Sequence, residues 1–372
     1  MLFFQFPFGG DSQYPPILNL IIIWIPFIIL IIYGQKIQAW TILGEVSRYL
    51  NKLKVYRDRS KEIMLNYVQK RGTIGEGRAR FEELTEFVTI LPVDMDPVGI
   101  VKKLDHVLTT QDEQLKNEVS RLLPKETNEI ERSCALNMVE VAMSLNSIYK
   151  IVRHYYILGK KSSNVYILAQ LQMILPMLLR QAEALVSAMK ALEEGQPLGD
   201  GIGPLVISHM MRGHPVTKVA KETVMAEVEH KGRRIALVKA EGPQGTVGRV
   251  DEAIKGLLNG PYSDASAIIM IDAALKLEGE PTGEVAEGIG AAIGGLGVEK
   301  FKIEELAYKY EVPLYAIIIK QSIIEAISIM KKEIANATEE VRNSMLKIIE
   351  NKVPEGGKAI VVGVGNTLGI AQ

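Results

Sequence analysis

The pattern of hydrophobic and polar residues changes near residue 195. Over residues 37–195 the pattern is helical with mixed charges, and no strand-like alternation appears before about residue 215. After Gly195, glycine becomes frequent and short runs of β-branched residues begin, which is typical of strands. We therefore predict a helical region over 35–195 and an α/β domain over 196–372.

Breaks in the pattern divide the helical region into separate helices. A charged helix is predicted over 37–70, and the glycines of 71–80 interrupt the pattern. Within 91–108 an Asp-Pro pair marks a helix start, because proline fits the first helical position. Further helices are predicted at about 112–122, 126–158 and 162–194.

Strands and helices alternate through the C-terminal half. A hairpin is predicted over 223–241, and a glycine-containing loop within 242–258 leads into a helix. Strands that are apolar throughout and alternate with helices form mostly parallel sheets with helices on both faces, so we predict the α/β fold class. The remaining strands are predicted at 266–275, 312–319 and 358–365, the remaining helices at 302–310, 322–334 and 338–351, and a long glycine-rich loop at 278–297.

An uncharged stretch near the N-terminus has the composition of a membrane span. Residues 17–33, ILNLIIIWIPFIILIIY, contain no charged side chain, and their length is near the lower limit for crossing a hydrocarbon core of ~30 Å. Lys and Arg are absent from 1–16 and frequent after residue 35. The positive-inside rule then predicts a single-pass protein of the cell membrane, with 1–16 outside, a transmembrane helix over 17–34 and the rest in the cytoplasm.

Other interpretations of the apolar stretches remain open. The N-terminal stretch is also compatible with a buried core helix. A cleaved signal peptide is disfavoured, because no basic segment precedes the stretch and no clear small-x-small site follows it. A second apolar run over 165–182 is interrupted by two glutamines, a proline and an arginine. We predict that this run is a buried helix of the soluble part.

The composition restricts the partners. The net charge is −1 and aromatic residues make up 6%, so we expect no nucleic-acid partner. The single cysteine, Cys134, allows no intramolecular disulfide, as is usual in a reducing compartment. The sequence has no HExxH motif and no cysteine pair, and no histidine follows His230. We predict no metal site, and the sequence leaves any cofactor unassigned.

Two aspartates stand in unusual positions. Asp200 lies between glycines ahead of an apolar run, and Asp272 ends an apolar strand. In parallel sheets the chemistry lies at the carboxyl ends of strands, and burial there raises the pKa of a carboxyl group. Each acid also has an ordinary structural explanation. Asp200 fits a helix N-cap, and Asp272 can accept hydrogen bonds from neighbouring backbone amides.

Glycine-rich turns supply further candidates for ligand binding. The turn GVGN (363–366) follows a strand, but it lacks the Gly-Lys-Ser/Thr of a Walker loop, and only six residues follow it. GPQGTVG (242–248) fits either an anion cradle at a helix N-terminus or a tight structural turn. The candidate ligand-binding residues are Gly363, Gly365, Asn366, Gly201, Gly203 and Thr246.

The two ends of the C-terminal half resemble one known signature when they are joined. AIVVGVGNTLG followed by LGDGIGPLV is similar to the signature of the germination-protease and hydrogenase-maturation-endopeptidase fold. There a strand ends in Gly-x-Gly-Asn, and a loop leads to an Asp/Glu-Gly/Ala-x-Gly helix start. GPQGTVGRVDEAIKGLL and AIIMIDAAL match in the same cyclic order. The half over 196–372 thus resembles a circular permutant, in which Gln372 is expected close to Gly199.

The resemblance implies a function. Asp200 and Asp272 match the functional acids of that fold, and two facing carboxylates can share a proton and activate a water. The implied protein is a membrane-anchored, cytoplasm-facing endopeptidase with a protein or peptide substrate, held in the membrane through 17–34. The histidine with which the hydrogenase-maturation branch holds nickel is absent. A non-catalytic ligand-binding or scaffold protein is the alternative, and a homo-oligomer stays open.

The whole chain has a second resemblance. Its N-terminal apolar stretch, helical region and length resemble an archaeal family of single-pass membrane proteins of about 370 residues. That family carries no assigned function, so this resemblance supports the architecture alone.

Overall fold

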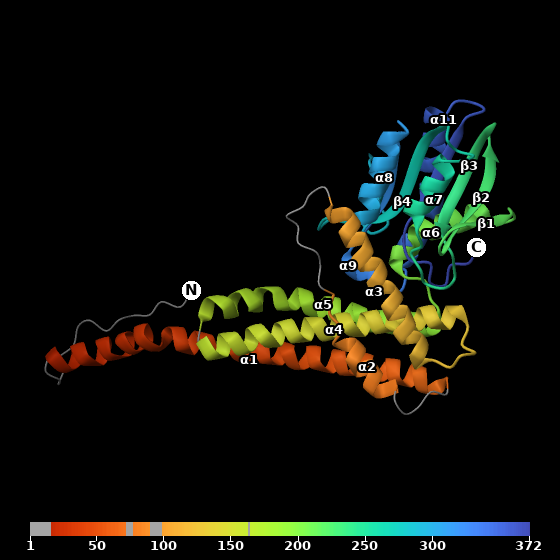
Figure 1. The fold of residues 1–372 in the computed structure, drawn as a ribbon. Coiled ribbons are helices and arrows are strands. Elements are labelled where there is room, and N and C mark those ends of the chain that lie inside the picture. Colours follow the sequence, from red (N-terminus) through yellow and green to blue (C-terminus); the bar gives the residue numbers. More distant parts are fainter. Residues whose placement is uncertain (1–15, 72–76, 90–98, 163) are drawn as a thin grey trace. The chain divides into compact units, whose positions relative to one another are not determined.

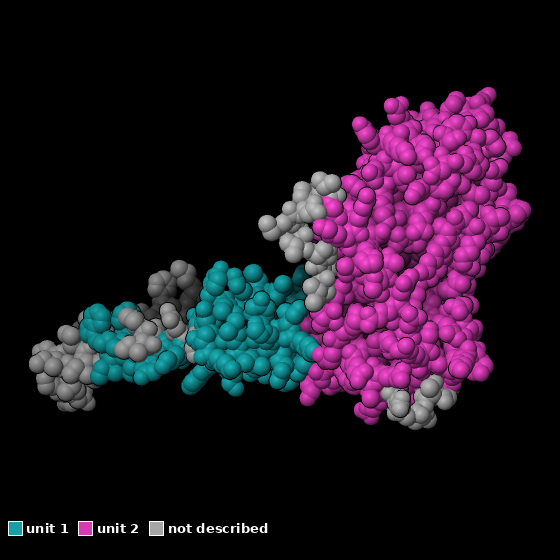
Figure 2. Space-filling model, in the orientation of Figure 1, with its two compact units in different colours: residues 1–52, 149–178 teal, residues 53–148, 179–372 magenta. Residues whose placement is uncertain are grey.

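The computed structural model describes residues 16–71, 77–89, 99–162 and 164–372, with only the backbone described at 16–23, 30–32 and 35. The chain divides into two compact units, coloured separately in Figure 2. One unit comprises Met1–Lys52 and Tyr149–Leu178, and the other comprises Leu53–Ile148 and Leu179–Gln372. The second unit contains the whole C-terminal half together with part of the helical region.

The described residues of the N-terminal half form five helices. The predicted helix over 37–70 is the C-terminal part of a longer helix, and the predicted helices within 91–108 and at 112–122 belong to one continuous helix. The predicted Asp-Pro helix start lies outside the described residues. The helices are α1 (Pro16–Lys70), α2 (Gly77–Thr85), α3 (Ile100–Leu122), α4 (Glu129–Ser162) and α5 (Val165–Glu194).

The structure does not support the N-terminal transmembrane helix predicted over 17–34. That stretch is helical within α1, but many of its side chains lie outside the described residues. Among the described residues, α5 is the one helix long and apolar enough to cross a membrane, by length and composition alone. The prediction of a buried helix over 165–182 also needs correction. Only 22% of the apolar window in α5 is buried, and Met173 and Met177 are exposed.

A seven-stranded sheet organises the C-terminal half (Figure 1). Its order is β1-β2-β3-β7-β4-β6-β5, and β3, β7, β4 and β6 form a parallel centre. Because β2 and β5 alone run against that direction, the prediction of a mostly parallel sheet is confirmed. The strands are β1 (Val216–Ala220), β2 (Thr223–His230), β3 (Arg233–Ala240), β4 (Ala265–Leu275), β5 (Val285–Ile289), β6 (Leu314–Gln321) and β7 (Lys358–Gly363).

Helices cover both faces of this sheet. One core joins the sheet to α6 (Ile202–Met211), α10 (Lys332–Asn336) and α11 (Thr338–Lys352). The other core joins it to α7 (Val250–Leu258) and α8 (Val298–Lys309). Successive side chains of a strand point to opposite faces. In β4, Ile269 and Ile271 accordingly enter the α6 core, whereas Ile268 and Met270 enter the α7 core.

Two predicted segments differ from the structure. The predicted loop over 278–297 contains β5, an edge strand that is largely exposed and therefore lacks an apolar pattern. The predicted helix over 322–334 is divided into α9 (Ile323–Ile327) and α10. The break pairs with the segment before α6, because the Met330 amide donates to the Pro197 carbonyl at 2.8 Å.

The end of β7 and the start of α6 approach each other through glycine backbone. A Cβ on Gly203 would lie 2.4 Å from the carbonyl oxygens of both Ile271 and Val364. A Cβ on Gly363 would lie 2.5 Å from the Gly203 carbonyl oxygen. Side chains at these positions would therefore force the strand and the helix apart.

We expect Gly203→Ala to lower the free energy of unfolding by roughly 1–3 kcal/mol, because the new methyl group overlaps backbone that cannot yield locally. Thermal unfolding of the full chain, followed by circular dichroism in neutral detergent micelles, measures this. Gly256→Ala in α7 is the matched control. Its Cβ meets nothing within 4 Å, so this variant should gain up to about 1 kcal/mol. Equal stability of the two variants would contradict the close approach.

Candidate functional site

Asp272 lies where two neighbouring parallel strands end at different points. The β4–β7 ladder ends at the pair Ile271–Gly363, while β4 continues beside β6 to Leu275. By strand alternation Asp272 faces the α7 and α8 side of the sheet. Its side chain is buried, with 7% of its surface exposed. This carboxyl group thus lies at the carboxyl end of the parallel sheet, as the sequence predicted.

Asp200 lies at the same end of the sheet, in the turn that precedes α6. It lies in the 3₁₀ turn Gly199–Gly201 before α6, and its Oδ2 accepts a hydrogen bond from the backbone amide of Asn366 at 3.0 Å. No side-chain cap bond forms at either helix start, so Asp200 is not the N-cap that its position suggested. Its carboxylate instead joins the turn after β7 to the start of α6.

The turn after β7 needs glycine to pass so close to Asp200. Gly365 has a φ of +132°, and a Cβ there would lie 2.0 Å from the Asp200 carbonyl oxygen. Both the conformation and the contact exclude larger residues. The backbone of one end of the C-terminal half therefore fits directly onto the other.

Both aspartates line one cavity of about 310 Å³. The loop residues Val247, Gly294 and Gly365 also line it, as does Glu299 in the first turn of α8. The cavity is large enough for a small ligand or a segment of an extended chain. It opens at the carboxyl ends of β4 and β7, where ligand sites of parallel sheets usually lie.

Both carboxyl groups have a raised pKa, and Asp200 contributes to the shift of Asp272. Burial, then the charge of Asp200, raises the pKa of Asp272 to about 8, although the Ala273 and Gly294 amides act in the opposite direction. Burial also raises the pKa of Asp200, and the Asn366 amide partly offsets this. Two like charges in one cavity resist simultaneous ionisation. The pair therefore keeps a proton near neutral pH.

The predicted ligand-binding residues have different surroundings. Gly365 lines the aspartate cavity. Asn366 and Thr246 line an adjoining cavity of about 260 Å³. Gly201, Gly203 and Gly363 are buried where α6 meets the strand ends, and they are not among the residues that line the aspartate cavity.

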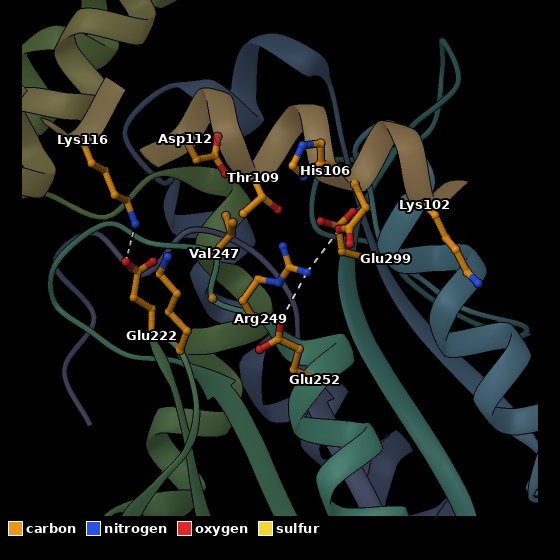
Figure 3. Close-up of a pocket in the computed structure, with 13 residues that line it drawn as sticks. Lys102, His106, Thr109, Asp112, Lys116, Glu222, Val247, Arg249, Glu252 and Glu299 are labelled. Carbon is orange, nitrogen blue, oxygen red and sulfur yellow. Dashed lines mark hydrogen bonds and ion pairs between the residues drawn. The ribbon is translucent and has the colours of Figure 1, made fainter. Parts of the chain in front are cut away.

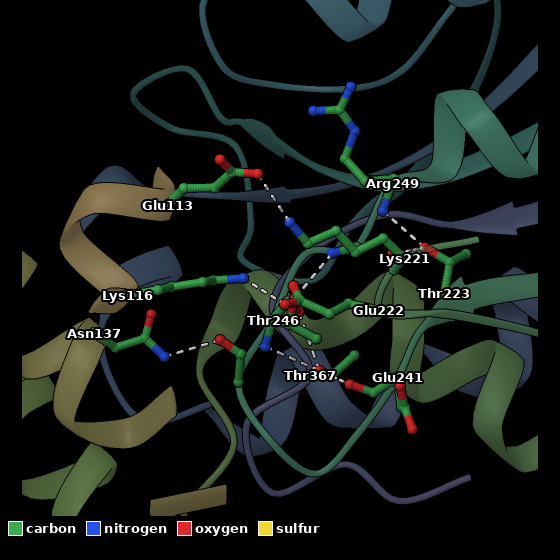
Figure 4. Close-up of polar contacts among 12 residues, drawn as sticks. Glu113, Lys116, Asn137, Lys221, Glu222, Thr223, Glu241, Thr246, Arg249 and Thr367 are labelled. Carbon is green, nitrogen blue, oxygen red and sulfur yellow. Dashed lines mark hydrogen bonds and ion pairs between the residues drawn. The ribbon is translucent and has the colours of Figure 1, made fainter. Parts of the chain in front are cut away.

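Thr246 holds a loop in place (Figure 4), and Asn366 bonds to the same loop. The Thr246 hydroxyl donates to Glu222 at 2.6 Å, and Glu222 in turn pairs with Lys116 of α3. The Asn366 side-chain amide donates to the Gly245 carbonyl at 3.2 Å, and the Asn137 side chain of α4 donates to the same carbonyl at 2.8 Å. These bonds fix the loop 242–249, which carries Val247 to the rim of the aspartate cavity.

A second cavity of about 460 Å³ adjoins the first and shares Val247, Gly248 and Glu299 with it. Figure 3 shows α3 forming one wall, with Arg249 and Glu252 on the opposite side. Charged residues of both signs line this cavity, so a polar passage adjoins the aspartates.

Ion pairs hold α3 beside this passage. Asp105 of α3 pairs with Arg249 at 3.3 Å and with Lys302 of α8 at 2.8 Å. Both cations also contact the buried Asp251, at 3.4 Å and 3.3 Å respectively. The four charges form a network that joins α3 to α7 and α8.

The sequence did not indicate that Glu299 lines the aspartate cavity or that α3 lines the adjoining one. An acid in the first turn of a helix is usually a response to the helix dipole, so Glu299 carried no distinguishing signal. The α3 residues read as an ordinary solvated helix face. Within the described part of the chain, no group of three or more His, Cys, Asp or Glu side chains is arranged to hold a metal ion.

Comparison with known families accounts for both halves of the chain. Residues 20–195 match the N-terminal domain of a protein family of unknown function, DUF1512, and residues 198–371 match the C-terminal domain of the same family. The chain belongs to the DUF1512 family. No curated protein matches it. The family is defined without an activity, so the function must be argued from the site.

Asp272 should make stability depend on pH. Its pKa of about 8 lies above the ordinary 3.8, so between about pH 4 and pH 8 the folded chain holds a proton that the unfolded chain has released. The contribution of Asp272 to stability is therefore complete at low pH. It is lost as pH rises through the window, by at most about 1.4 kcal/mol per pH unit.

We expect Asp272→Asn to stabilise the full chain at pH 8 by at least about 1.4 kcal/mol, the equivalent of one pKa unit. At pH 5 the gain should be clearly smaller, because this pH lies only about one unit above the ordinary pKa of 3.8 at which the unfolded chain begins to release the proton. Denaturant unfolding at both pH values in neutral detergent measures this. The control is Asp264→Asn, because Lys358 lowers the pKa of that exposed carboxyl group and its removal should give no gain. An equal gain at pH 5 and pH 8 would contradict a raised pKa.

Proposed function

We propose that this protein is an endopeptidase that hydrolyses a peptide bond with Asp200 and Asp272 as an acid–base pair. The observation that carries the proposal is that both carboxyl groups line one cavity at the end of the parallel sheet and together retain a proton. A protonated and an ionised carboxyl group in one cavity are the requirement for moving a proton in both directions.

The surroundings of the two acids suggest their roles. The Asn366 amide donates to Asp200, and this favours its ionised form, so Asp200 is the base that removes a proton from water. Asp272 is more deeply buried and keeps its proton until about pH 8, so it donates to the carbonyl oxygen of the scissile bond. Water oxygen then bonds to the carbonyl carbon, which becomes a tetrahedral diol. The carbon–nitrogen bond breaks, the amine leaves with the proton that Asp200 took, and one hydroxyl of the diol returns a proton to Asp272 as the carboxylic acid forms.

The chain path supports the permuted protease-like fold that the sequence resemblance implies. A Cβ on Gly369 would lie 2.4 Å from the Gly195 carbonyl oxygen, so the C-terminal segment passes the residues that lead into α6. Gln372 lies beyond this approach, where its amide donates to the Gly242 carbonyl at 2.8 Å. Joining the two segments would give the order strand, glycine turn, acid and helix of that fold.

We propose further that the chain is anchored in the cell membrane through 17–34 with its N-terminus outside. The uncharged sequence of 17–33 and the basic residues that follow it support this orientation. The C-terminal half would then act in the cytoplasm, on a protein or peptide substrate at or near the membrane.

One observation favours a non-catalytic alternative. Asp200 accepts a bond from Asn366, and Asp272 accepts one from Ala273 at 2.7 Å, so each acid also stabilises backbone. In this alternative the cavity holds a ligand or a partner without reaction. Fold alone does not distinguish the two functions. A test of whether cleavage requires both aspartates does.

Cleavage of cellular proteins tests the proposal. The full chain in neutral detergent is incubated with a cell extract of the source organism, and new peptide N-termini are mapped by mass spectrometry. We expect cleavages that require wild-type protein and that fall by roughly 10²–10⁴-fold in Asp200→Asn and in Asp272→Asn. Asp264→Asn is the surface control and should cleave like wild type. Identical maps for wild type and both folded cavity variants would contradict the endopeptidase and favour the binding protein.

The pH profile of any cleavage tests the assigned roles. Because Asp272 must be protonated to donate, kcat should fall as pH rises through about 8. Initial rates on one identified substrate peptide between pH 5 and pH 10 measure this. A rate that stays level up to pH 10 would contradict Asp272 as the acid.

A further inference from the structure

A cavity in the other compact unit has features that the proposed peptidase does not use. It has a volume of about 560 Å³ and lies between α1 and α4. Lys36, Trp40 and Ser47 of α1 line it together with Tyr156 and Lys160 of α4. All of these residues belong to the unit formed by Met1–Lys52 and Tyr149–Leu178.

The charge of this cavity is positive and has no acidic counterpart. Lys36 and Lys160 are its charged lining residues, and no aspartate or glutamate in the described part of the chain lines it. Within the described residues neither lysine has a carboxylate partner, and the Lys36 ammonium lies 5.7 Å from the centre of the Tyr33 ring. Two ammonium groups at one cavity attract an anion, and lysine binds phosphate as a point charge.

The rest of the lining is amphipathic. Ala39 is buried, Leu43 is half-buried, and Trp40 is 75% exposed. Tryptophan and tyrosine combine an apolar ring with a polar group, and they are enriched where lipid headgroups meet hydrocarbon. A ligand with an anionic head and an apolar body would satisfy both the lysines and the apolar floor.

The position of the cavity in the chain points to the same ligand. Lys36 lies two residues after the uncharged stretch of 17–34, and Lys160 precedes the apolar run of 165–182. Apolar side chains on the same unit are exposed, including Ile29 and Ile37 on α1 and Met173 and Met177 on α5. The two lysines thus stand at the polar ends of the two most apolar segments of this unit.

We propose that this cavity binds the phosphate headgroup of an anionic membrane phospholipid. Lys36 and Lys160 hold the phosphate, Trp40 and Tyr156 lie at the level of the headgroup, and the start of an acyl chain lies on Ala39 and Leu43. Basic pockets between helices at a membrane surface bind lipid headgroups in this way. The site rests on the proposed membrane anchoring, but it involves neither aspartate, so its failure and the failure of the peptidase proposal are distinguishable.

Trp40 provides a direct readout. The chain has two tryptophans, so Trp24→Phe leaves Trp40 as the single tryptophan. The full chain with this substitution is held in neutral maltoside micelles and titrated with dihexanoylphosphatidylglycerol or dihexanoylphosphatidylcholine. We expect a saturable change in Trp40 fluorescence, with the phosphatidylglycerol bound at least tenfold more tightly.

Charge variants test the two lysines. Lys36→Gln combined with Lys160→Gln should weaken phosphatidylglycerol binding at least tenfold. Lys161→Gln is the control, because it removes one positive charge from the residue next to Lys160, which does not line the cavity. Lys36→Arg combined with Lys160→Arg should retain binding, and this separates loss of charge from loss of folding.

Three results would overturn the proposal. Equal affinity for the two lipids would remove the role of the anionic headgroup. An equal loss in Lys161→Gln and in the double glutamine variant, or an unchanged affinity in the latter, would remove the role of this cavity. Competition by glycerol 3-phosphate as strong as by the lipid would identify a soluble phosphate ligand instead of a membrane lipid.

Discussion

The close backbone approach between the end of β7 and the start of α6 is the constraint on which the C-terminal half depends. Gly203 and Gly363 leave no room for a side chain, and Gly365 passes directly over the Asp200 carbonyl. This contact joins residues more than 150 positions apart in the chain. It brings the 3₁₀ turn of Asp200 to the strand end that carries Asp272. The cavity therefore exists because glycine allows two backbones to touch.

That arrangement creates an electrostatic conflict at the sheet end. Burial disfavours charge on Asp272, and the nearby Asp200 adds repulsion, while backbone amides favour the ionised form of each. Retention of a proton on Asp272 up to about pH 8 resolves the conflict. The same conflict costs stability as pH rises, which a purely structural role would not require. Natural sites that keep such a cost usually use it in chemistry.

Much of the fold follows from local pattern. The apolar strands β4, β6 and β7 and the hairpin of β2 and β3 have patterns that local physics explains, so sequence predicts them well. β5 was missed because an exposed edge strand needs no apolar face. The helix predicted over 322–334 is broken because Met330 bonds to Pro197, a distant partner that local propensity does not include. In this second case a non-local contact outweighs the local preference.

For the site, the sequence by itself determined which acids stand at a strand end and at a glycine-flanked helix start. The cyclic order of its motifs, through a resemblance, also indicated that Asp200 and Asp272 belong together. Tertiary structure alone decided that both line one cavity, that Asp200 bonds Asn366 instead of capping its helix, and that α3 walls the adjoining passage. The reason is physical. A sequence pattern records what each residue does to its own strand or helix, whereas burial, shared protons and ion pairs depend on neighbours that only folding supplies.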